Sequence, residues 1–432
     1  MKFQDLDSWL RWQESLHPRE IELGLERLRP VYSRLSPLPE HCRVITVAGT
    51  NGKGSCVGVA EAVAVAAGTR VACYTSPHLF RYNERVRLGG RPVEDDRLLD
   101  AFEKVDLARR GVPLTYFEFG TLAALQIFAE AGPELAVLEV GLGGRLDAVN
   151  IVDADVAVIT SVGLDHQAWL GMDRESIGAE KAGIVRSGRP LVLGEPDPPR
   201  SVLQIAEQRR ALVHAVDRDW RIRPFEDGWL LEGGGTVLGP LPYGPLRGAL
   251  IRNAGCAIRA LSLAGMAVGT DVVSAAIEGL SLPGRLQTIS GPVEWVFDLA
   301  HNVQGAQLLA ETLASAPRQG VTRAVFGMLA DKDIPGVVET MMPQVDEWFV
   351  TGLGGSRGAA ADEVASQAAS AGVAQMEVCK DVGEACRRAE NRSVPGDRVV
   401  VFGSFYLVGP AMQAVGLYSP PTPAQEDQAP ST

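Results

Sequence analysis

The stretch VITVAGTNGKGS, residues Val44 to Ser55, runs from an apolar segment into a cluster of glycines that holds one lysine. Four of its first six residues are apolar, which is typical of a short buried strand. The sequence that follows, KGSCVGVAEAVAVAAG, predicts an apolar helix that begins at Lys53 and ends at Gly68. We therefore expect a strand, a glycine-rich turn and a helix in direct succession.

A glycine-rich turn between a strand and a helix is a common phosphate-binding arrangement. It lets backbone N–H groups converge at the helix N-terminus, where the helix dipole favours an anion. Lys53 adds a mobile positive charge for the outer phosphates, and Ser55 adds a hydroxyl suited to Mg²⁺. The standard loop places Ser or Thr directly after the lysine, whereas Gly54 intervenes here. The alternative is a glycine-rich turn that holds a surface lysine, but the flanking strand and helix favour nucleotide phosphate.

Composition narrows the class of protein. A chain of 432 residues predicts two or three domains, and 46% apolar with 22% charged residues is typical of a globular protein. No apolar run is long enough to span a bilayer and the N-terminus lacks a signal-peptide core, so we expect a cytoplasmic protein without a membrane partner. The six cysteines show no CxxC spacing and are expected to be free, mostly buried thiols. A net charge of −12 without a Lys/Arg block argues against nucleic-acid binding.

The first part of the chain alternates between strand and helix patterns. Buried strands are expected at 70–76, 134–141, 154–161 and 189–195, and helices at 120–132 and 173–185. This alternation predicts an α/β fold, with a mainly parallel sheet covered on both faces. In such sheets ligands gather at the carboxyl ends of the strands, where the phosphate loop, Ser76, Glu139 and His166 are all placed by the sequence.

The second part of the chain changes character twice. Residues 220–246 predict hairpin-like β structure, and a helix is expected over 249–265. A Pro-Gly break at 281–287 precedes four further strands, which indicate a smaller, Rossmann-like α/β domain. We therefore expect an ATP-binding domain over 1–285, a C-terminal domain over 286–418, and a disordered proline-rich tail over 419–432.

Several polar residues lie where chemistry is expected. Glu139 interrupts an apolar strand, where a metal near the phosphate loop or a structural ion pair would compensate its charge. The GLGGR bend that follows is expected to turn Arg145 and Asp147 toward a cleft. By itself His166 is more often a hydrogen-bonded structural residue than a ligand, and Lys181 is by itself an ordinary helix lysine.

A second group of candidates comes from the later half. FDLAHN places Asp298 and His301 at a strand end, and with Arg285 and Asn253 they are candidates for the base and ribose side of a nucleotide pocket.

Ten motifs occur in an order that resembles the folylpolyglutamate synthase family of the Mur-ligase superfamily, and its bacterial bifunctional branch in particular. The resemblance covers nearly the whole chain except about the last dozen residues, and an intervening glycine in GKGS is normal in that family. The motifs are VAGTNGKGS, YTSPHLFRYNERVR, LTYFEFGTLAAL, LEVGLGGRLDAVN, LDHQAWLG, ESIGAEKAGI, LPGRLQ, FDLAHN, GMLADKD and FGSFYLVG.

The resemblance implies an ATP-dependent amide ligase. ATP would convert a substrate carboxylate into an acyl phosphate, and the amine of L-glutamate would displace phosphate from it. The implied substrates are 7,8-dihydropteroate and reduced folates, and the implied cofactors are ATP and Mg²⁺, with K⁺ as a further candidate. The resemblance also implies a carbamylated lysine at Lys181, and we expect a monomer.

Individual roles are implied in the same way, motif by motif. Lys53, Lys181 and His166 correspond to catalytic residues. Metal ligands correspond to Ser76, Glu139, His166 and Lys181. Substrate contacts to the pterin correspond to Thr115, Phe117, Arg145 and Asp147. Contacts to ATP correspond to Gly49, Thr50, Asn51, Gly52, Lys53, Gly54, Ser55, Asn253, Arg285, Asp298 and His301.

Three alternatives stay open. An enzyme that only extends folates would share most motifs, but such family members depart from the GRLDA pattern present here. A cell-wall Mur ligase carries a separate N-terminal UDP-binding domain, whereas the phosphate loop begins at Gly49 in this chain. A non-catalytic ATP-binding regulator would have lost Lys53, Glu139 or Lys181, and all three are present.

Overall fold

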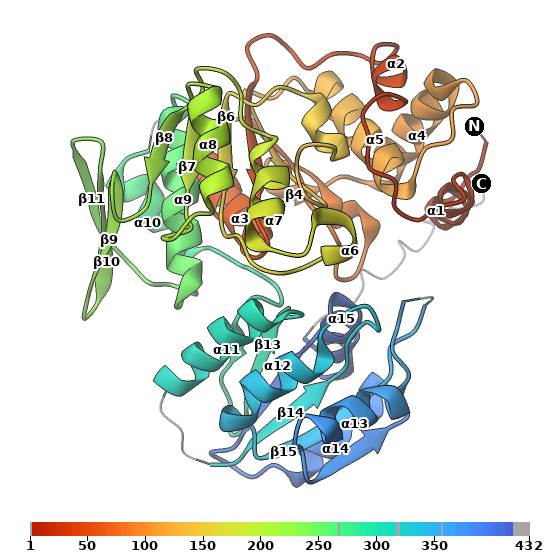
Figure 1. Ribbon diagram of the computed structural model, residues 1–432, viewed down its shortest axis with the longest axis vertical. Coiled ribbons are helices and arrows are strands. Elements are labelled where there is room, and N and C mark those ends of the chain that lie inside the picture. Colours follow the sequence, from red (N-terminus) through yellow and green to blue (C-terminus); the bar gives the residue numbers. More distant parts are fainter. Residues whose placement is uncertain (1, 267, 317–319, 356, 418–432) are drawn as a thin grey trace, which may run out of the picture. The chain divides into compact units, whose positions relative to one another are not determined.

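The computed structural model describes residues 2–266, 268–316, 320–355 and 357–417 (Figure 1). Strand β1 (Arg43–Ala48) and helix α3 (Lys53–Ala66) flank the glycine-rich turn. Two residues beyond the last residue of α3, Gly68 has a φ of +74°, the left-handed conformation that glycine adopts readily at a helix C-terminus. The predicted strand, turn and helix are confirmed.

The large sheet of the first unit has eight strands, and β1 lies inside it between β5 and β6. Pairing is parallel except at one edge, where β3 and β4 are antiparallel to their neighbours and were not expected. In sheet order the strands are β4 (Arg91–Pro92), β3 (Val86–Leu88), β2 (Val71–Tyr74), β5 (Leu135–Glu139), β1, β6 (Val156–Ile159), β7 (Pro190–Leu193) and β8 (Leu212–Ala215).

Side chains of β1 are buried on both faces of this sheet. Val44 and Ala48 belong to one hydrophobic cluster, while Ile45 and Val47 belong to the cluster on the other side. Because alternate residues of a strand point to opposite faces, a strand apolar throughout has to be covered twice. The predicted parallel sheet with two covered faces is confirmed.

Helices of the first unit supply this cover, and α3 packs against α9 and α10. Short 3-10 turns, η1 (Tyr82–Arg85) and η2 (Ala148–Ile151), lie in the connections. The remaining helices are α1 (Leu6–Ser15), α2 (Leu28–Tyr32), α4 (Asp95–Arg109), α5 (Tyr116–Ala131), α6 (Gln167–Leu170), α7 (Arg174–Ala182), α8 (Arg200–Gln208), α9 (Ala249–Leu263), α10 (Thr270–Glu278) and α11 (Val303–Ser315).

The predicted hairpin region forms a separate antiparallel sheet. Its strands, in the order β11 (Thr236–Leu241), β10 (Gly228–Gly233) and β9 (Trp220–Phe225), are green in Figure 1. Trp220 and Trp229 are buried in the same hydrophobic cluster as α3 and α9 residues, so the small sheet is anchored to the helical layer.

The second unit is built on a six-stranded sheet. Its strands run in the order β12 (Gln287–Ile289), β13 (Glu294–Asp298), β17 (Arg398–Phe402), β14 (Thr322–Phe326), β15 (Glu347–Thr351) and β16 (Met376–Cys379). Pairing from β13 to β16 is parallel. The helical segments beside it (Figure 1) are α12 (Ile334–Met341), η3 (Met342–Gln344), α13 (Ala361–Ser370), α14 (Val382–Arg392) and α15 (Phe405–Ala414). The four expected strands are confirmed, whereas β12 and β16 were not expected.

Contacts along the chain divide it into two compact units. The first takes the described residues of Met1–Gln287 and Ala300–Arg318, and the second takes those of Thr288–Leu299 and Gln319–Thr432. The predicted disordered tail, 419–432, lies outside the described residues. All six cysteines are free and buried, as expected. Within the described part of the chain, each helix is too short or too polar to cross a lipid bilayer.

Candidate active site

The phosphate loop is packed so closely that its glycines cannot be replaced without displacing neighbours. Gly52 has a φ of +84°, and a Cβ built there would lie 2.6 Å from side-chain atoms of Asn253. A Cβ at Gly54 would overlap the guanidinium of Arg285. Two residues expected on the base and ribose side therefore lie against the loop itself, next to where a bound phosphate would be held.

Lys53 is folded back onto the loop from which it projects. Its Nζ donates hydrogen bonds to the carbonyl oxygens of Gly49, at 2.9 Å, and Thr50, at 3.2 Å. The hydroxyl of Thr160 braces the loop from β6 by donating to the carbonyl of Asn51 at 2.6 Å. Backbone carbonyls hold the lysine over the turn, from which its ammonium can reach a phosphate oxygen.

A network of amides and one carboxylate joins the loop to the start of α11. Asn51 and Asn302 exchange two side-chain hydrogen bonds of 3.0 and 3.1 Å, and Asn302 also donates to Asp165 at 3.0 Å. His301 Nε2 lies 3.3 Å from Asp165 Oδ2, the same carboxylate oxygen that accepts from Asn302. Asn302 of the FDLAHN motif thus connects Asn51 of the phosphate loop with Asp165.

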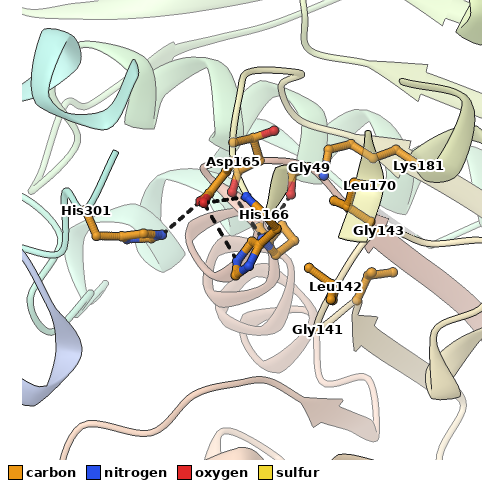
Figure 2. Close-up of a pocket in the computed structure, with 12 residues that line it drawn as sticks. Gly49, Gly141, Leu142, Gly143, Asp165, His166, Leu170, Lys181 and His301 are labelled. Atoms are coloured by element: carbon orange, nitrogen blue, oxygen red, sulfur yellow. Dashed lines mark hydrogen bonds and ion pairs between the residues drawn. The ribbon is translucent and has the colours of Figure 1, made fainter. Parts of the chain in front are cut away.

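A pocket of about 40 Å³ opens beside these residues (Figure 2). In Figure 2 Asp165 lies between His166 and His301, and dashed lines mark its contacts with both. The volume of this pocket suits a few water molecules. The lining residues are Gly49, Thr50, Lys53, Val140, Gly141, Leu142, Gly143, Asp165, His166, Leu170, Lys181 and His301.

Lys181 reaches this pocket from α7 and is 3% exposed. Burial, and after it the nearby charge of Lys53, lower the pKa of its ammonium from 10.5 to about 7, against the opposing charges of Asp165 and Asp147. Near neutral pH a substantial fraction of this amine is uncharged, which is the form that reacts with CO₂ and other electrophiles.

Glu139 and Ser76 form a second polar group at the ends of β5 and β2. The backbone N–H of Ser76 donates to Glu139 Oε2 at 3.2 Å. Burial raises the pKa of Glu139, and the positive charges of Lys53 and Arg285 oppose that rise. A buried carboxylate at this position suits a hard divalent cation, which would offset its desolvation.

The four expected metal ligands therefore fall into two pairs, Ser76 with Glu139 and His166 with Lys181. The charge of Lys53 acts on the pKa of both Glu139 and Lys181, so the lysine is electrostatically close to each pair. Within the described ranges, no three His, Cys, Asp or Glu side chains are grouped as a ready-made metal site.

Asp147 is 2% exposed and does not line the pocket, which differs from the expectation that it faces a cleft. Its carboxylate accepts hydrogen bonds from the backbone N–H groups of Leu142, at 2.8 Å, and Val149, at 3.0 Å. Burial nevertheless raises its pKa to about 7. Arg145 is exposed and pairs with Glu180 at 2.8 Å, so only this member of the bend faces outward.

Thr115 and Phe117 begin α5. The hydroxyl of Thr115 accepts from the backbone N–H of Glu118, and the Glu118 carboxylate accepts from the backbone N–H of Thr115, which together form a capping box. The ring of Phe117 lies against Gly141, which lines the pocket. A Cβ built on Gly141 would lie only 2.6–3.0 Å from atoms of this ring. Phe117 is thus near the pocket, whereas Thr115 serves the helix end.

Two site residues escaped the sequence analysis as candidates. Asp165 directly precedes His166, and Asn302 directly follows His301. Their position next to two named candidates is the sequence feature that could have identified them. The structure places Asp298 at the end of β13 in the second unit.

Comparison with known proteins decides the family. The dihydrofolate synthase/folylpolyglutamate synthase of Escherichia coli K12 is 42% identical over 412 residues, which cover 95% of each chain. The chain belongs to the dihydrofolate synthase/folylpolyglutamate synthase family. Residues 284–405 also match the family model described as Mur ligase, glutamate ligase domain.

Solved structures of this family share the fold over nearly the whole chain. E. coli FolC in complex with DHPP and ADP superimposes with a TM-score of 0.91 at 40% identity, and covers 96% of this chain and 98% of its own. The bifunctional folylpolyglutamate synthase/dihydrofolate synthase from Yersinia pestis, complexed with AMPPNP and Mn, gives 0.89 at 43% identity, with 95% and 98% covered. The Mur-ligase fold expected for this family is confirmed.

Proposed function

We propose that this chain is an ATP-dependent ligase that joins L-glutamate to 7,8-dihydropteroate and to the glutamyl chain of reduced folates. The observation that carries the proposal is the phosphate loop itself, whose Lys53 borders a pocket shared with His166 and Lys181. Relatives that match over nearly their full length are named for both activities, and their solved structures hold ADP or AMPPNP.

The chemistry requires two displacements in one site. A carboxylate oxygen of the folate substrate attacks the γ-phosphorus of ATP, and ADP leaves. The amine nitrogen of glutamate then attacks the acyl carbon, phosphate leaves, and the nitrogen loses a proton. Because charge spreads over the phosphoryl oxygens in the first step, backbone N–H groups of the loop and the ammonium of Lys53 stabilise it.

A divalent metal fits the donor set found here. Glu139 supplies a buried carboxylate, Ser76 lies beside it, and His166 supplies an imidazole at the pocket. When bound, the metal would neutralise charge on the phosphates. The relative from Y. pestis was solved with Mn, which supports a divalent cation, and Mg²⁺ is our proposal for this chain.

We also propose that Lys181 acts as a carbamate. Its amine is buried at the pocket with a pKa of about 7, so the uncharged form that reacts with CO₂ is well populated at neutral pH. Carbamylation would replace a buried ammonium by an anionic oxygen donor, which a metal accepts as a ligand.

We propose that four residues serve substrate recognition, namely Phe117, Arg145, Asp147 and Thr115. Phe117 is placed to stack on a flat pterin beside Gly141, and Arg145 is exposed. Asp147 and Thr115 are occupied by backbone groups, so we propose that both shape the substrate loops from within.

The remaining assignments stay predictions. We propose an ATP-binding domain over 1–285 and a C-terminal domain over 286–418; the family match at 284–405 supports the second. A cytoplasmic location is supported by six free cysteines, since a reducing compartment keeps thiols reduced. We also propose K⁺ as a further ion, which the resemblance implies, and a monomeric state.

Phosphate release tests the proposed function directly. Purified protein with ATP and Mg²⁺ should release phosphate only when glutamate is combined with dihydropteroate, or with a reduced folate. Mass spectrometry should find products heavier by one glutamyl residue. Release that depends on UDP-muramoyl substrates instead would favour a cell-wall ligase. Release with glutamate and a reduced folate, but not with glutamate and dihydropteroate, would leave only the polyglutamylating activity.

A further inference from the structure

A largely buried ion pair that the proposed reaction does not use joins β3 to α3, the helix that follows the phosphate loop. Arg87 on β3 pairs with Glu61 on α3, with 2.8 Å between Nε and Oε2. The two side chains are only 17% and 9% exposed. Glu61 follows Lys53 by about two turns on the same helix, so the pair ties the helix of the phosphate loop to the sheet edge.

The other end of the same guanidinium holds a different segment. Its second nitrogen, Nη1, donates to the hydroxyl of Thr75 at 2.8 Å and to the carbonyl of Glu84 at 2.7 Å. The backbone N–H of Thr75 donates to the carbonyl of Arg85 at 2.9 Å. Thr75 is therefore held by both its hydroxyl and its backbone.

Thr75 directly precedes Ser76, one of the proposed metal ligands. Ser76 in turn donates its backbone N–H to Glu139, another proposed ligand. A continuous series of hydrogen bonds and one peptide bond thus runs from α3 through Arg87 and Thr75 to the Ser76–Glu139 pair.

The guanidinium of Arg87 also keeps its positive charge, which strengthens its hydrogen bonds to both partners. Burial would lower the pKa of Arg87, but the charge and hydrogen bond of Glu61, together with the nearby Cys73 and Glu139, raise this pKa overall, so the guanidinium stays charged. A buried ion pair adds little net stability compared with apolar side chains of the same volume. What a planar guanidinium adds is direction, because it fixes two partners at once, which a lysine ammonium does less rigidly.

We propose that Arg87 is a positioning residue for the divalent metal, acting through Thr75 to fix Ser76 relative to the phosphate loop. The inference rests on the proposed function only for the identity of the metal ligands. Outer-shell partners of metal ligands typically change metal affinity by about 10- to 100-fold when they are removed.

The experiment measures metal binding without turnover. Free and bound Mn²⁺ are quantified by electron paramagnetic resonance, in protein saturated with AMPPNP. Arg87→Lys keeps the charge and loses the two-sided geometry, and Thr75→Val keeps the shape and loses the hydroxyl. Each should weaken Mn²⁺ binding about tenfold, and the double variant should be little weaker than either, since both remove the same hydrogen bond.

Arg323→Lys is the matched control. Arg323 is also a buried arginine, 7% exposed at its side chain, and it is paired with Asp397 and Glu347 in the second unit. Its replacement should lower the melting temperature and leave Mn²⁺ affinity unchanged. If Arg87→Lys and Thr75→Val behave like this control, the pair is only structural and the proposal is wrong. Should Arg87→Lys not fold, Thr75→Val alone decides.

Activity assays separate this proposal from the proposed function. With wild-type ligation established, the two variants should need about tenfold more Mg²⁺ for half-maximal rate. At saturating Mg²⁺ their kcat and their KM for glutamate should return to near the wild-type values. A wild type that binds Mn²⁺ and AMPPNP but ligates nothing would overturn the proposed function and leave the Mn²⁺ test of Arg87 intact.

Discussion

Two buried charged groups of the first unit, Lys181 and Asp147, differ from the buried Asp397 of the second unit. In the first unit, burial moves the pKa of Lys181 down to about 7 and that of Asp147 up to about 7, so both drift toward their neutral forms. In the second unit, burial likewise disfavours the charge of Asp397. There, hydrogen bonds from Val394 N–H, Arg323 and Val321 N–H, together with the charge of Arg323, outweigh burial and lower its pKa.

The difference shows where each charge finds compensation. Arg323 lies between Asp397 and Glu347, so the second unit satisfies its buried charges with its own side chains. The pocket of the first unit combines Lys53 and Lys181, two cations whose charges disfavour each other. Anionic phosphates, or a carbamate at Lys181, would supply the negative charge that offsets these two cations. Uncompensated charge of this kind is typical of a ligand site.

The largest effect is expected at Lys53. Lys53→Ala should lower the ligation rate about 1,000-fold, because the charge that meets the transferring phosphoryl group is lost. The melting temperature should stay within about 2 °C, since two hydrogen bonds of its ammonium go to loop carbonyls rather than to groups of the hydrophobic core. Lys380→Ala, at an exposed lysine, is the control and should change neither. Near-normal turnover of folded Lys53→Ala would contradict the phosphate-loop assignment.

Asp397→Ala should have the opposite profile. Removing one partner of the buried pair leaves Arg323 and two backbone N–H groups without that carboxylate, at a cost of about 3–5 kcal/mol in the free energy of unfolding. Urea denaturation measures this loss. Turnover well below the melting temperature should stay within about threefold of wild type. If Asp397→Ala lost much of its activity but none of its stability, Asp397 would not be a purely structural residue, and the proposed difference from the pocket of the first unit would be wrong.

Lys181→Ala should reduce ligation about 100-fold, because the oxygen donor proposed to form there is missing. Acetate or another small carboxylate should restore part of the rate. Wild-type activity should also fall in CO₂-depleted buffer of low pH, where the amine is protonated and no carbamate re-forms. Full activity of the variant without any additive would rule out the role.

Asp147 separates the two proposed activities. Asp147→Asn should impair dihydropteroate ligation about tenfold more than folate extension, because it loosens the loop that carries Arg145, which we propose as a pterin contact. Initial rates with each acceptor at saturating ATP give the ratio. Equal losses would assign Asp147 to the general stability of the bend, and the bifunctional assignment would then depend on wild-type rates alone.

The pH dependence of stability should also reflect the shifted pKa values of Lys181 and Asp147. Between about pH 7 and 10.5 the unfolded chain keeps the proton of Lys181 that the folded chain has released, so stability rises with pH by up to about 1.4 kcal/mol per unit. Asp147 acts with the opposite sign between about pH 3.8 and 7, where only the folded state holds its proton. Urea unfolding in CO₂-free buffer should show a flatter rise above pH 7 for Lys181→Met. An unchanged slope would contradict the shifted pKa.

Sequence patterns were sufficient for the main elements of the fold. β1 and α3 follow from one apolar run, a glycine cluster and a second apolar run, and the four strands around β1 follow from equally continuous apolar segments. The strands that escaped prediction, such as β3 and β16, are three and four residues long and carry charged or half-exposed side chains. Short strands of that kind are stabilised by their neighbours in the sheet, which no local pattern reveals.

The sequence by itself determined the chemistry that is available: a lysine among glycines, carboxylates and a histidine at strand ends, and ten ordered motifs of one family. Only the tertiary structure decided which of them are buried, paired or placed side by side. It turned Asp147 into its own loop, brought Asn302 to Asn51 across 251 positions, and lowered the pKa of Lys181 to about 7. The physical reason is that desolvation and hydrogen bonding depend on neighbours in space, whereas a sequence pattern reports only neighbours along the chain.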